Sequence, residues 1–277
     1  MHLLQAILMG IIQGLSEFLP ISSSGHLVFT SNFYKVFNHI DVVHGSSEEI
    51  FLDIMLHLGT LIAVLIFFRK DIIKILQALY LGIKNKDFSN LDFKMGIYII
   101  AGTILTIAVA LPLCEVSEKL VFMPSVVGIL LIFTGLLLLF SEYYSKKHPE
   151  KKNINLKSAI VTGIAQGLAS LPGFSRSGLT ISAGMLAGAD RVTAARYSFL
   201  LSIPVILGAS MIYPFVKIDL SEILMFNWPA IIIGTIVSAV VGYLCIKYFL
   251  KFVSKFSLAI FGYYCIIMGI VCFLFFK

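Results

Sequence analysis

The sequence contains two short segments whose residue types bind phosphate and move protons. The first has an amide, a carboxylate, three serines and an imidazole, at Gln13, Glu17, Ser22, Ser23, Ser24 and His26. The second has hydroxyls and a guanidinium, at Ser175, Arg176, Ser177 and Thr180. Arg presents a planar set of donors that matches phosphate oxygens, and a break before a helix presents main-chain N–H groups to anions. His and Glu transfer protons near neutral pH. Together these residues predict a phosphate site with acid–base chemistry.

The same residue types also have structural explanations. A serine before a helix often caps it, because its side-chain oxygen accepts a main-chain N–H. Glu17 and Arg176 could neutralise each other as a buried ion pair. Such a pair needs neither the neighbouring hydroxyls nor His26, so we favour the functional interpretation. Asp53 and His57 lie four residues apart, on one face of a predicted helix that could look into the same site.

The elements that position these residues are predicted to lie in a membrane. Hydrophobic residues make up 58% of the chain and charged residues 13%, and the mean hydropathy is +0.96. A hydrocarbon core of about 30 Å is crossed by about 20 apolar residues. Stretches of suitable length predict spans at 51–68, 95–113, 123–141, 197–214, 228–248 and 256–276. The net charge of +6 comes from basic residues in short loops, so we expect membrane topology, and no nucleic-acid partner, to explain it.

The chain contains an internal repeat. A shift of 153 positions aligns residues 10–25 with residues 163–178, and eight of the sixteen pairs are identical. The halves, roughly 1–145 and 153–277, therefore form one membrane domain over 1–277. Such repeats are typical of membrane proteins with a site at the repeat interface. Glycines spaced four apart, at 10 and 14 and at 163 and 167, indicate close helix packing.

Basic residues distinguish two topologies, because Lys and Arg accumulate on the cytoplasmic side. If each motif enters the membrane and returns, sixteen basic residues share one side: Arg69, Lys70, Lys74, Lys84, Lys86, Lys94, Lys146, Lys147, Lys151, Lys152, Lys157, Arg191, Arg196, Lys247, Lys251 and Lys255. Four lie on the other: Lys35, Lys119, Lys217 and Lys277. If each motif instead crosses the membrane once, the basic residues divide only about twelve to eight between the two sides. We therefore predict an all-α polytopic membrane protein with an inverted-topology repeat. Each half has a re-entrant helix-loop-helix and three transmembrane helices, and the first motif enters from outside.

The two motifs resemble those of a known family. QGLSEFLPISSSGH (13–26) and LPGFSRSGLT (171–180) are similar to the signatures of the integral-membrane undecaprenyl-diphosphate phosphatases, and the resemblance covers essentially the whole chain. It implies hydrolysis of undecaprenyl diphosphate to the monophosphate, which recycles the lipid carrier for cell-wall synthesis, and bacitracin resistance. By motif position it implies a functional set of Gln13, Glu17, Ser23, His26, Ser175, Arg176 and Thr180.

The resemblance also implies activity that depends on a divalent cation, Mg²⁺ or Ca²⁺. Gln13 stands where many relatives have Glu, which leaves Glu17 as the one acidic ligand in this motif for such a cation. We expect the protein in a bacterial inner or plasma membrane, and the predicted entry of the first motif from outside favours an active site on the extracytoplasmic side.

Three mechanisms fit these residues. Ser23 could attack phosphorus with His26 as base, His26 could attack, or His26 could activate water, and we favour the first. Arg176 would neutralise the diphosphate. A secondary transporter or flippase for a lipid phosphate or small anion is the rival, because inverted repeats and broken helices are typical of transporters. A nucleophile beside a base favours the enzyme.

Overall fold

The computed structural model describes residues 2–37, 46–120, 123–148, 153–218 and 220–275, and every regular element within these ranges is an α-helix. The helices are α1 (Leu3–Ser16), α2 (Ser23–Phe37), α3 (Ser47–Phe67), α4 (Arg69–Asn85), α5 (Leu91–Leu120), α6 (Pro124–Ser145), α7 (Leu156–Leu168), α8 (Arg176–Leu186), α9 (Arg191–Lys217), α10 (Leu220–Ile223), α11 (Trp228–Val253) and α12 (Ala259–Phe275).

The structure confirms a polytopic all-α membrane protein. Within the described residues, five helices (α3, α5, α6, α9 and α11) are long and apolar enough to cross a membrane. Each covers one of the predicted spans to within one residue at the ends of that span. The sixth predicted span, 256–276, corresponds to the shorter apolar helix α12, whose 17 residues extend about 26 Å.

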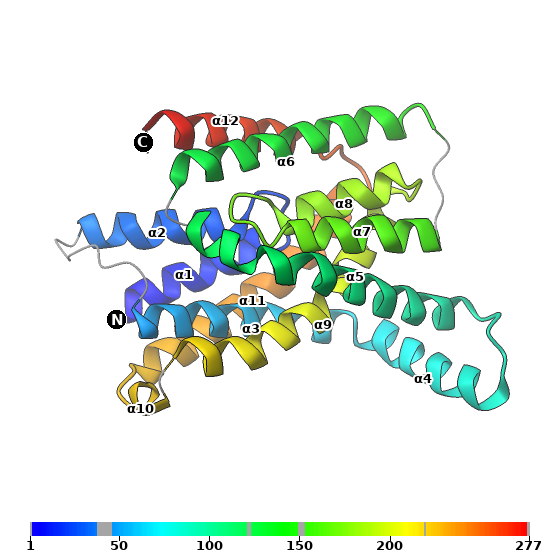
Figure 1. Cartoon of the computed structure of the whole chain (residues 1–277), viewed down its shortest axis with the longest axis horizontal. Helices are drawn as coiled ribbons and strands as arrows, with labels where there is room; N and C mark the ends of the chain where they lie inside the picture. The colour runs from blue at the N-terminus through cyan, green and yellow to red at the C-terminus, as the bar shows by residue number, and fades with distance from the viewer. Residues whose placement is uncertain (1, 38–45, 121–122, 149–152, 219, 276–277) are drawn as a thin grey trace.

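The two motif regions form helical hairpins that enter the molecule from opposite ends. We call α1, residues 17–22 and α2 the first hairpin, with residues 17–22 as the first tip. We call α7, residues 169–175 and α8 the second hairpin, with residues 169–175 as the second tip. In Figure 1 the first hairpin lies towards the left and the second towards the right, and the chain reverses between its two helices in each. This is the shape expected of two re-entrant segments. The inverted relation of the two halves across a membrane stays a prediction.

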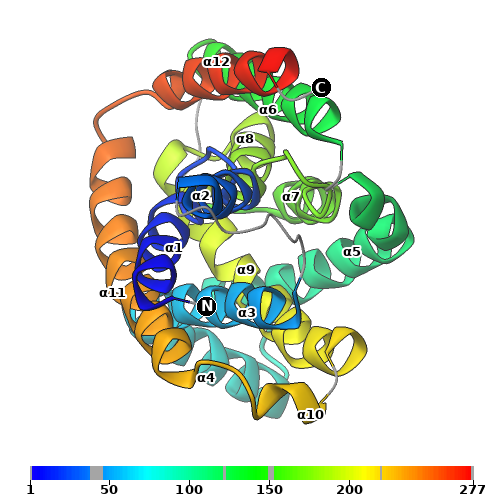
Figure 2. The same cartoon turned by 90° about the vertical axis from the view of Figure 1, so that its left-hand side faces the viewer.

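Helices of each half of the sequence pack against helices of the other half. α1 packs against α11, and α7 packs against α5, so each hairpin leans on a long helix of the other half. Glycines permit this close approach: a Cβ on Gly10 would lie 2.5 Å from Gly234 O, and one on Gly163 would lie 2.7 Å from Gly102 O. The predicted packing role of these glycines is confirmed. Figure 2 shows the result, in which longer helices surround the hairpins.

Helix α4 was not predicted from the sequence. Its lysines interrupt the apolar run, so the segment lacks the hydropathy of a span, yet its apolar residues recur at helical spacing. One side packs against α5, and Asp71 in the first turn forms an ion pair with Arg196 of α9 at 2.9 Å. Ile73, Leu76, Tyr80 and Ile83 are exposed on α4. This pattern is typical of a helix that lies along a membrane surface.

Candidate functional site

The two tips meet in the interior of the molecule. Ser177 at the start of α8 donates a hydrogen bond from Oγ to the carbonyl oxygen of Leu19 in the first tip, at 2.9 Å. Phe18 beside it is fully buried, and its ring packs edge-on against Phe199 of α9 with centroids 5.2 Å apart. A hydrogen bond from the start of α8 to the first tip, together with the packing of Phe18 on α9, therefore fixes the position of the first tip against the second hairpin.

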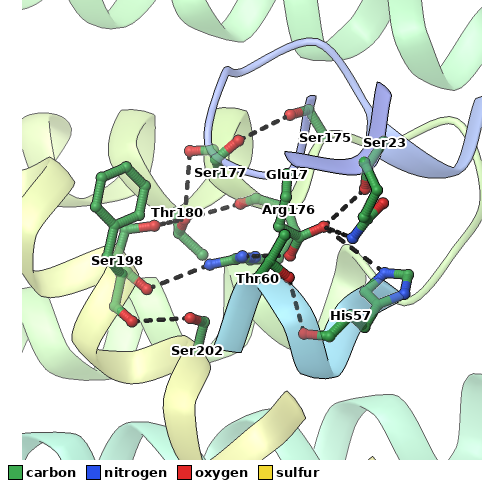
Figure 3. Close-up of polar contacts among 12 residues, drawn as sticks. Glu17, Ser23, His57, Thr60, Ser175, Arg176, Ser177, Thr180, Ser198 and Ser202 are labelled. Carbon is green, nitrogen blue, oxygen red and sulfur yellow. Dashed lines mark hydrogen bonds and ion pairs between the residues drawn. The ribbon is translucent and has the colours of Figure 1, made fainter. Parts of the chain in front are cut away.

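Glu17 is the centre of the polar contacts between the tips (Figure 3). Its Oε1 accepts a hydrogen bond from the Arg176 guanidinium at 2.5 Å. Its Oε2 accepts one from the Ser23 hydroxyl at 2.9 Å and one from the Gln13 amide at 3.0 Å. Only 6% of Glu17 and 17% of Arg176 is exposed. A buried carboxylate is costly unless it is paired and hydrogen-bonded. Here the second hairpin supplies the cationic partner of Glu17, and the first supplies two further hydrogen-bond donors.

The second hairpin positions Arg176 through its own hydroxyl groups. Ser175 caps α8, because its Oγ accepts the main-chain N–H of Gly178 at 3.1 Å. Thr180 donates to the main-chain oxygen of Arg176 at 2.7 Å, and its hydroxyl lies 2.6 Å from that of Ser198 on α9. Arg176 also donates to the main-chain oxygen of Ser198 at 3.4 Å. The capping explanation therefore holds for Ser175, while Ser177 and Thr180 connect elements around Arg176.

The first tip turns on an unusual backbone conformation at Ser22. Its φ of +70° lies in the left-handed region, which costs energy for a residue other than glycine. The Ser22 and Ser24 hydroxyls lie 3.4 Å apart. After this turn α2 begins at Ser23, whose hydroxyl faces Glu17. The left-handed conformation of Ser22 therefore precedes the turn after which the Ser23 hydroxyl, the predicted nucleophile, faces Glu17.

The structure places His26 apart from Glu17. Its Nδ1 lies 2.8 Å from the main-chain oxygen of Ser22, and its Nε2 lies 2.5 Å from the hydroxyl of Tyr264 on α12. Both ring nitrogens are thus engaged, and neither bonds to Ser23. The expectation that His26 is the base for Ser23 does not match this geometry, in which Glu17 accepts the Ser23 proton.

Three side chains outside the two motifs contact residues of the site: His57 contacts Glu17, Ser198 contacts Thr180 and Arg176, and Tyr264 contacts His26. His57 of α3 was expected only to face the cavity, and its Nε2 lies 3.7 Å from Glu17 Oε2 (Figure 3). Its Nδ1 bonds to the main-chain oxygen of Asp53 at 2.8 Å, so the four-residue spacing was an informative signal. Ser198 and Tyr264 lie on α9 and α12, far from either motif, and nothing in their local sequence marks them.

The residues at the centre do not form a metal site by themselves. No group of three or more His, Cys, Asp or Glu side chains that could hold a metal occurs in the described part of the chain. Both oxygens of Glu17 already accept hydrogen bonds. Gln13 Oε1 is buried without a partner, but a single amide oxygen is not sufficient for Mg²⁺ or Ca²⁺, which need six or more oxygen ligands.

Comparison with known proteins gives a family for the whole chain. Residues 6–271 match the family described as bacitracin resistance protein BacA. Proteins named undecaprenyl-diphosphatase are similar over nearly their full length. One from Methanobrevibacter smithii is 41% identical over 99% of this chain and 98% of its own. One from Halothermothrix orenii is 42% identical over 98% and 97%, and one from Geotalea daltonii is 38% identical over 99% and 98%. The chain therefore belongs to the BacA family of bacitracin resistance proteins.

Proposed function

We propose that this protein hydrolyses undecaprenyl diphosphate to undecaprenyl phosphate and inorganic phosphate in a cell membrane. Such hydrolysis recycles the lipid carrier for cell-wall synthesis and confers bacitracin resistance. Family membership and the names of the relatives support this activity. The observation that carries it is the hydrogen-bonded set of Ser23, Glu17 and Arg176, drawn from both hairpins and surrounded by apolar helices.

Arg176 is the phosphate-binding group of this mechanism. Its guanidinium contacts only one oxygen of Glu17, and its other contact, to the main-chain oxygen of Ser198, is long at 3.4 Å. Donors of Arg176 are therefore free to turn to the diphosphate, whose charge exceeds that of a carboxylate. The hydroxyls of Ser175, Ser177 and Thr180 line the start of α8 and complete the phosphate-binding surface.

Ser23 is the nucleophile and Glu17 its base. The Ser23 oxygen attacks the terminal phosphorus, the bond to the bridging oxygen breaks, and undecaprenyl phosphate leaves. The proton of Ser23 passes to Glu17 Oε2, which already accepts it in a hydrogen bond. Water then attacks the phosphoserine, inorganic phosphate leaves, and Ser23 regains its proton.

A divalent cation enters this site only together with the substrate. Mg²⁺ typically keeps several waters and binds through one or two carboxylates and substrate phosphates. Because the described residues offer no complete ligand set, we propose that Mg²⁺ or Ca²⁺ is held mainly by the diphosphate. No step above depends on it.

Phosphate release from a lipid diphosphate tests the proposal. Purified protein should release phosphate from undecaprenyl diphosphate, and a diphosphate without the tail should be a much poorer substrate, because binding of the remote tail helps to orient the phosphorus. Ser23→Ala should lose about a thousandfold in turnover, roughly 4 kcal/mol of barrier. Ser254→Ala at the end of α11 is the matched control. If vesicles moved the lipid across the bilayer without releasing phosphate, the rival transporter would replace the enzyme; the family assignment does not favour it.

We also propose that the site opens to the extracytoplasmic side, because the first hairpin is predicted to enter from there. In a Cys114→Ser background, cysteine at Lys119 should react with an impermeant reagent from outside, and cysteine at Lys251 should not. The reverse labelling would invert the topology. Spheroplasts given the lipid from outside should release phosphate outside.

A further inference from the structure

The side chain of Tyr264 joins the outer helix α12 to the first hairpin. Its hydroxyl lies 2.5 Å from His26 Nε2, and the two rings stack with centroids 5.7 Å apart and planes 17° apart. Tyr264 belongs to neither sequence motif. A stack and a hydrogen bond on the same imidazole fix both the plane of the ring and its direction.

The contacts of His26 decide which of its nitrogens carries a proton. A carbonyl oxygen only accepts hydrogen bonds, so the contact of Nδ1 with the Ser22 carbonyl at 2.8 Å requires a proton on Nδ1. In the neutral ring Nε2 then has a lone pair, and the Tyr264 hydroxyl donates to it. A proton that moves to the basic nitrogen of His26, Nε2, therefore comes from the Tyr264 hydroxyl.

His26, the partner of the tyrosine hydroxyl, also lies on the same helix as the nucleophile. Ser23 and His26 lie three residues apart in the first turn of α2, which puts them on one face of that helix. Ser23 already has Glu17 as its proton acceptor. The pair of His26 and Tyr264 is thus not needed for the first step, and His26 presents it from the helix face that also carries Ser23.

We propose that Tyr264 is a catalytic residue for the second half of the reaction, in which water hydrolyses the phosphate on Ser23. This rests on the proposed function. The attacking water gives a proton to the Tyr264 oxygen as the Tyr264 proton moves to His26 Nε2. The new bond from water oxygen to phosphorus forms, the bond from phosphorus to the Ser23 oxygen breaks, and Ser23 takes back the proton held by Glu17. Inorganic phosphate leaves, and His26 returns its proton to the solvent.

Tyr264→Phe tests this role, because it keeps the stacked ring and removes only the hydroxyl. With lipid diphosphate labelled at the terminal phosphate, the variant should accumulate acid-stable label on Ser23, and phosphate release should fall about tenfold or more. A first burst of undecaprenyl phosphate should persist. Tyr263→Phe, one position earlier and 60% exposed, is the matched control and should behave as the unaltered protein.

Two results would overturn the proposal. One is unchanged turnover in Tyr264→Phe without accumulated label. The other is an equal loss of undecaprenyl phosphate and inorganic phosphate without label, which would place Tyr264 in the first step or in the structure alone.

Nitrogen NMR of the histidines in the detergent-solubilised protein gives a measurement that needs no turnover. His26 should be protonated at Nδ1 in both proteins, because the Ser22 carbonyl oxygen accepts that proton, and the Nε2 resonance should move in Tyr264→Phe, which removes the hydrogen bond to that nitrogen. An unchanged Nε2 resonance in the variant would overturn the coupling of the two side chains. If the unaltered protein released no phosphate at all, the proposed function would fail and, with it, the catalytic role of Tyr264, while the NMR result would still decide the coupling.

Discussion

The first and second tips share one ancestral pattern but contribute opposite chemistry. Ser23 and Arg176 occupy equivalent positions in the repeat, and each is the first residue of its helix, α2 or α8. Glu17 corresponds to Ser170. The first hairpin therefore contributes the carboxylate and the proposed nucleophile, and the second contributes the cation. Two helix starts at equivalent positions of the sequence repeat come together, and differences at single positions give the proposed site its chemistry.

The largest effect is expected when the cation of the second hairpin, Arg176, is removed. Arg176→Ala should lower turnover about a thousandfold or more, roughly 4 kcal/mol of barrier, because nothing replaces its donors at the phosphate. Arg176→Lys keeps the charge but loses the planar fork, so a loss of about tenfold or more is expected. Steady-state phosphate release measures both. Wild-type turnover in Arg176→Ala with a lower melting temperature would mean that the ion pair with Glu17 is only structural.

Glu17 and Ser170 occupy equivalent positions of the repeat, but substitutions at the two should lower turnover by very different amounts. Glu17→Gln keeps the shape but removes the proton acceptor for Ser23, so turnover should fall about a hundredfold, near 2.7 kcal/mol. Ser170→Ala should change turnover by less than about twofold, because this side chain is exposed and is not among the hydrogen-bond partners of Glu17 or Arg176 in the described residues. Similar losses in the two variants would contradict the division of labour between the tips.

Substitutions in the glycine contacts between helices, in contrast, should destabilise the fold equally in the two halves. Gly10→Ala and Gly163→Ala each force a methyl group against the backbone of a partner helix, at 2.5 and 2.7 Å. We expect each to destabilise the fold by about 1–3 kcal/mol, as overpacking does. Gly208→Ala, which has open space on α9, is the control and should be neutral or stabilise the fold by up to about 1 kcal/mol, because alanine favours a helix interior over glycine. Thermal unfolding in detergent measures all three, and a loss in only one half would show that the interfaces are not equivalent.

The smallest effect is expected at the left-handed residues. Ser22 has φ +70° in the first tip, whereas the second tip has Gly173 at φ +97°, at a position that is not equivalent. Ser22→Gly should relieve strain and raise the free energy of unfolding by less than about 1 kcal/mol. Turnover should change little if the main chain of Ser22, which holds His26, is what matters. A large loss would assign the Ser22 hydroxyl to substrate binding.

Hydropathy and the repeat were sufficient to predict most of the fold from the sequence. Spans have a strong compositional signal, and the eight identities located both hairpins. Helix α4 was missed because its lysines dilute that signal. Within the site, motif spacing marked Glu17, Ser23 and Arg176 correctly as neighbours. It could not give the direction of His26, because that depends on Tyr264, 238 residues away on another helix.

The packing of helices across the two halves also sets an order of assembly during synthesis. The ribosome delivers the chain from its N-terminus, so α1 emerges more than 200 residues before α11, the helix that its glycine face requires. Until Arg176 follows, Glu17 has no cationic partner in the other hairpin. An unpaired carboxylate is costly in lipid, which favours a first hairpin that stays near the membrane surface until the second half is inserted. We therefore expect the N-terminal segment to reach its final position late in biogenesis, after the second half has been inserted.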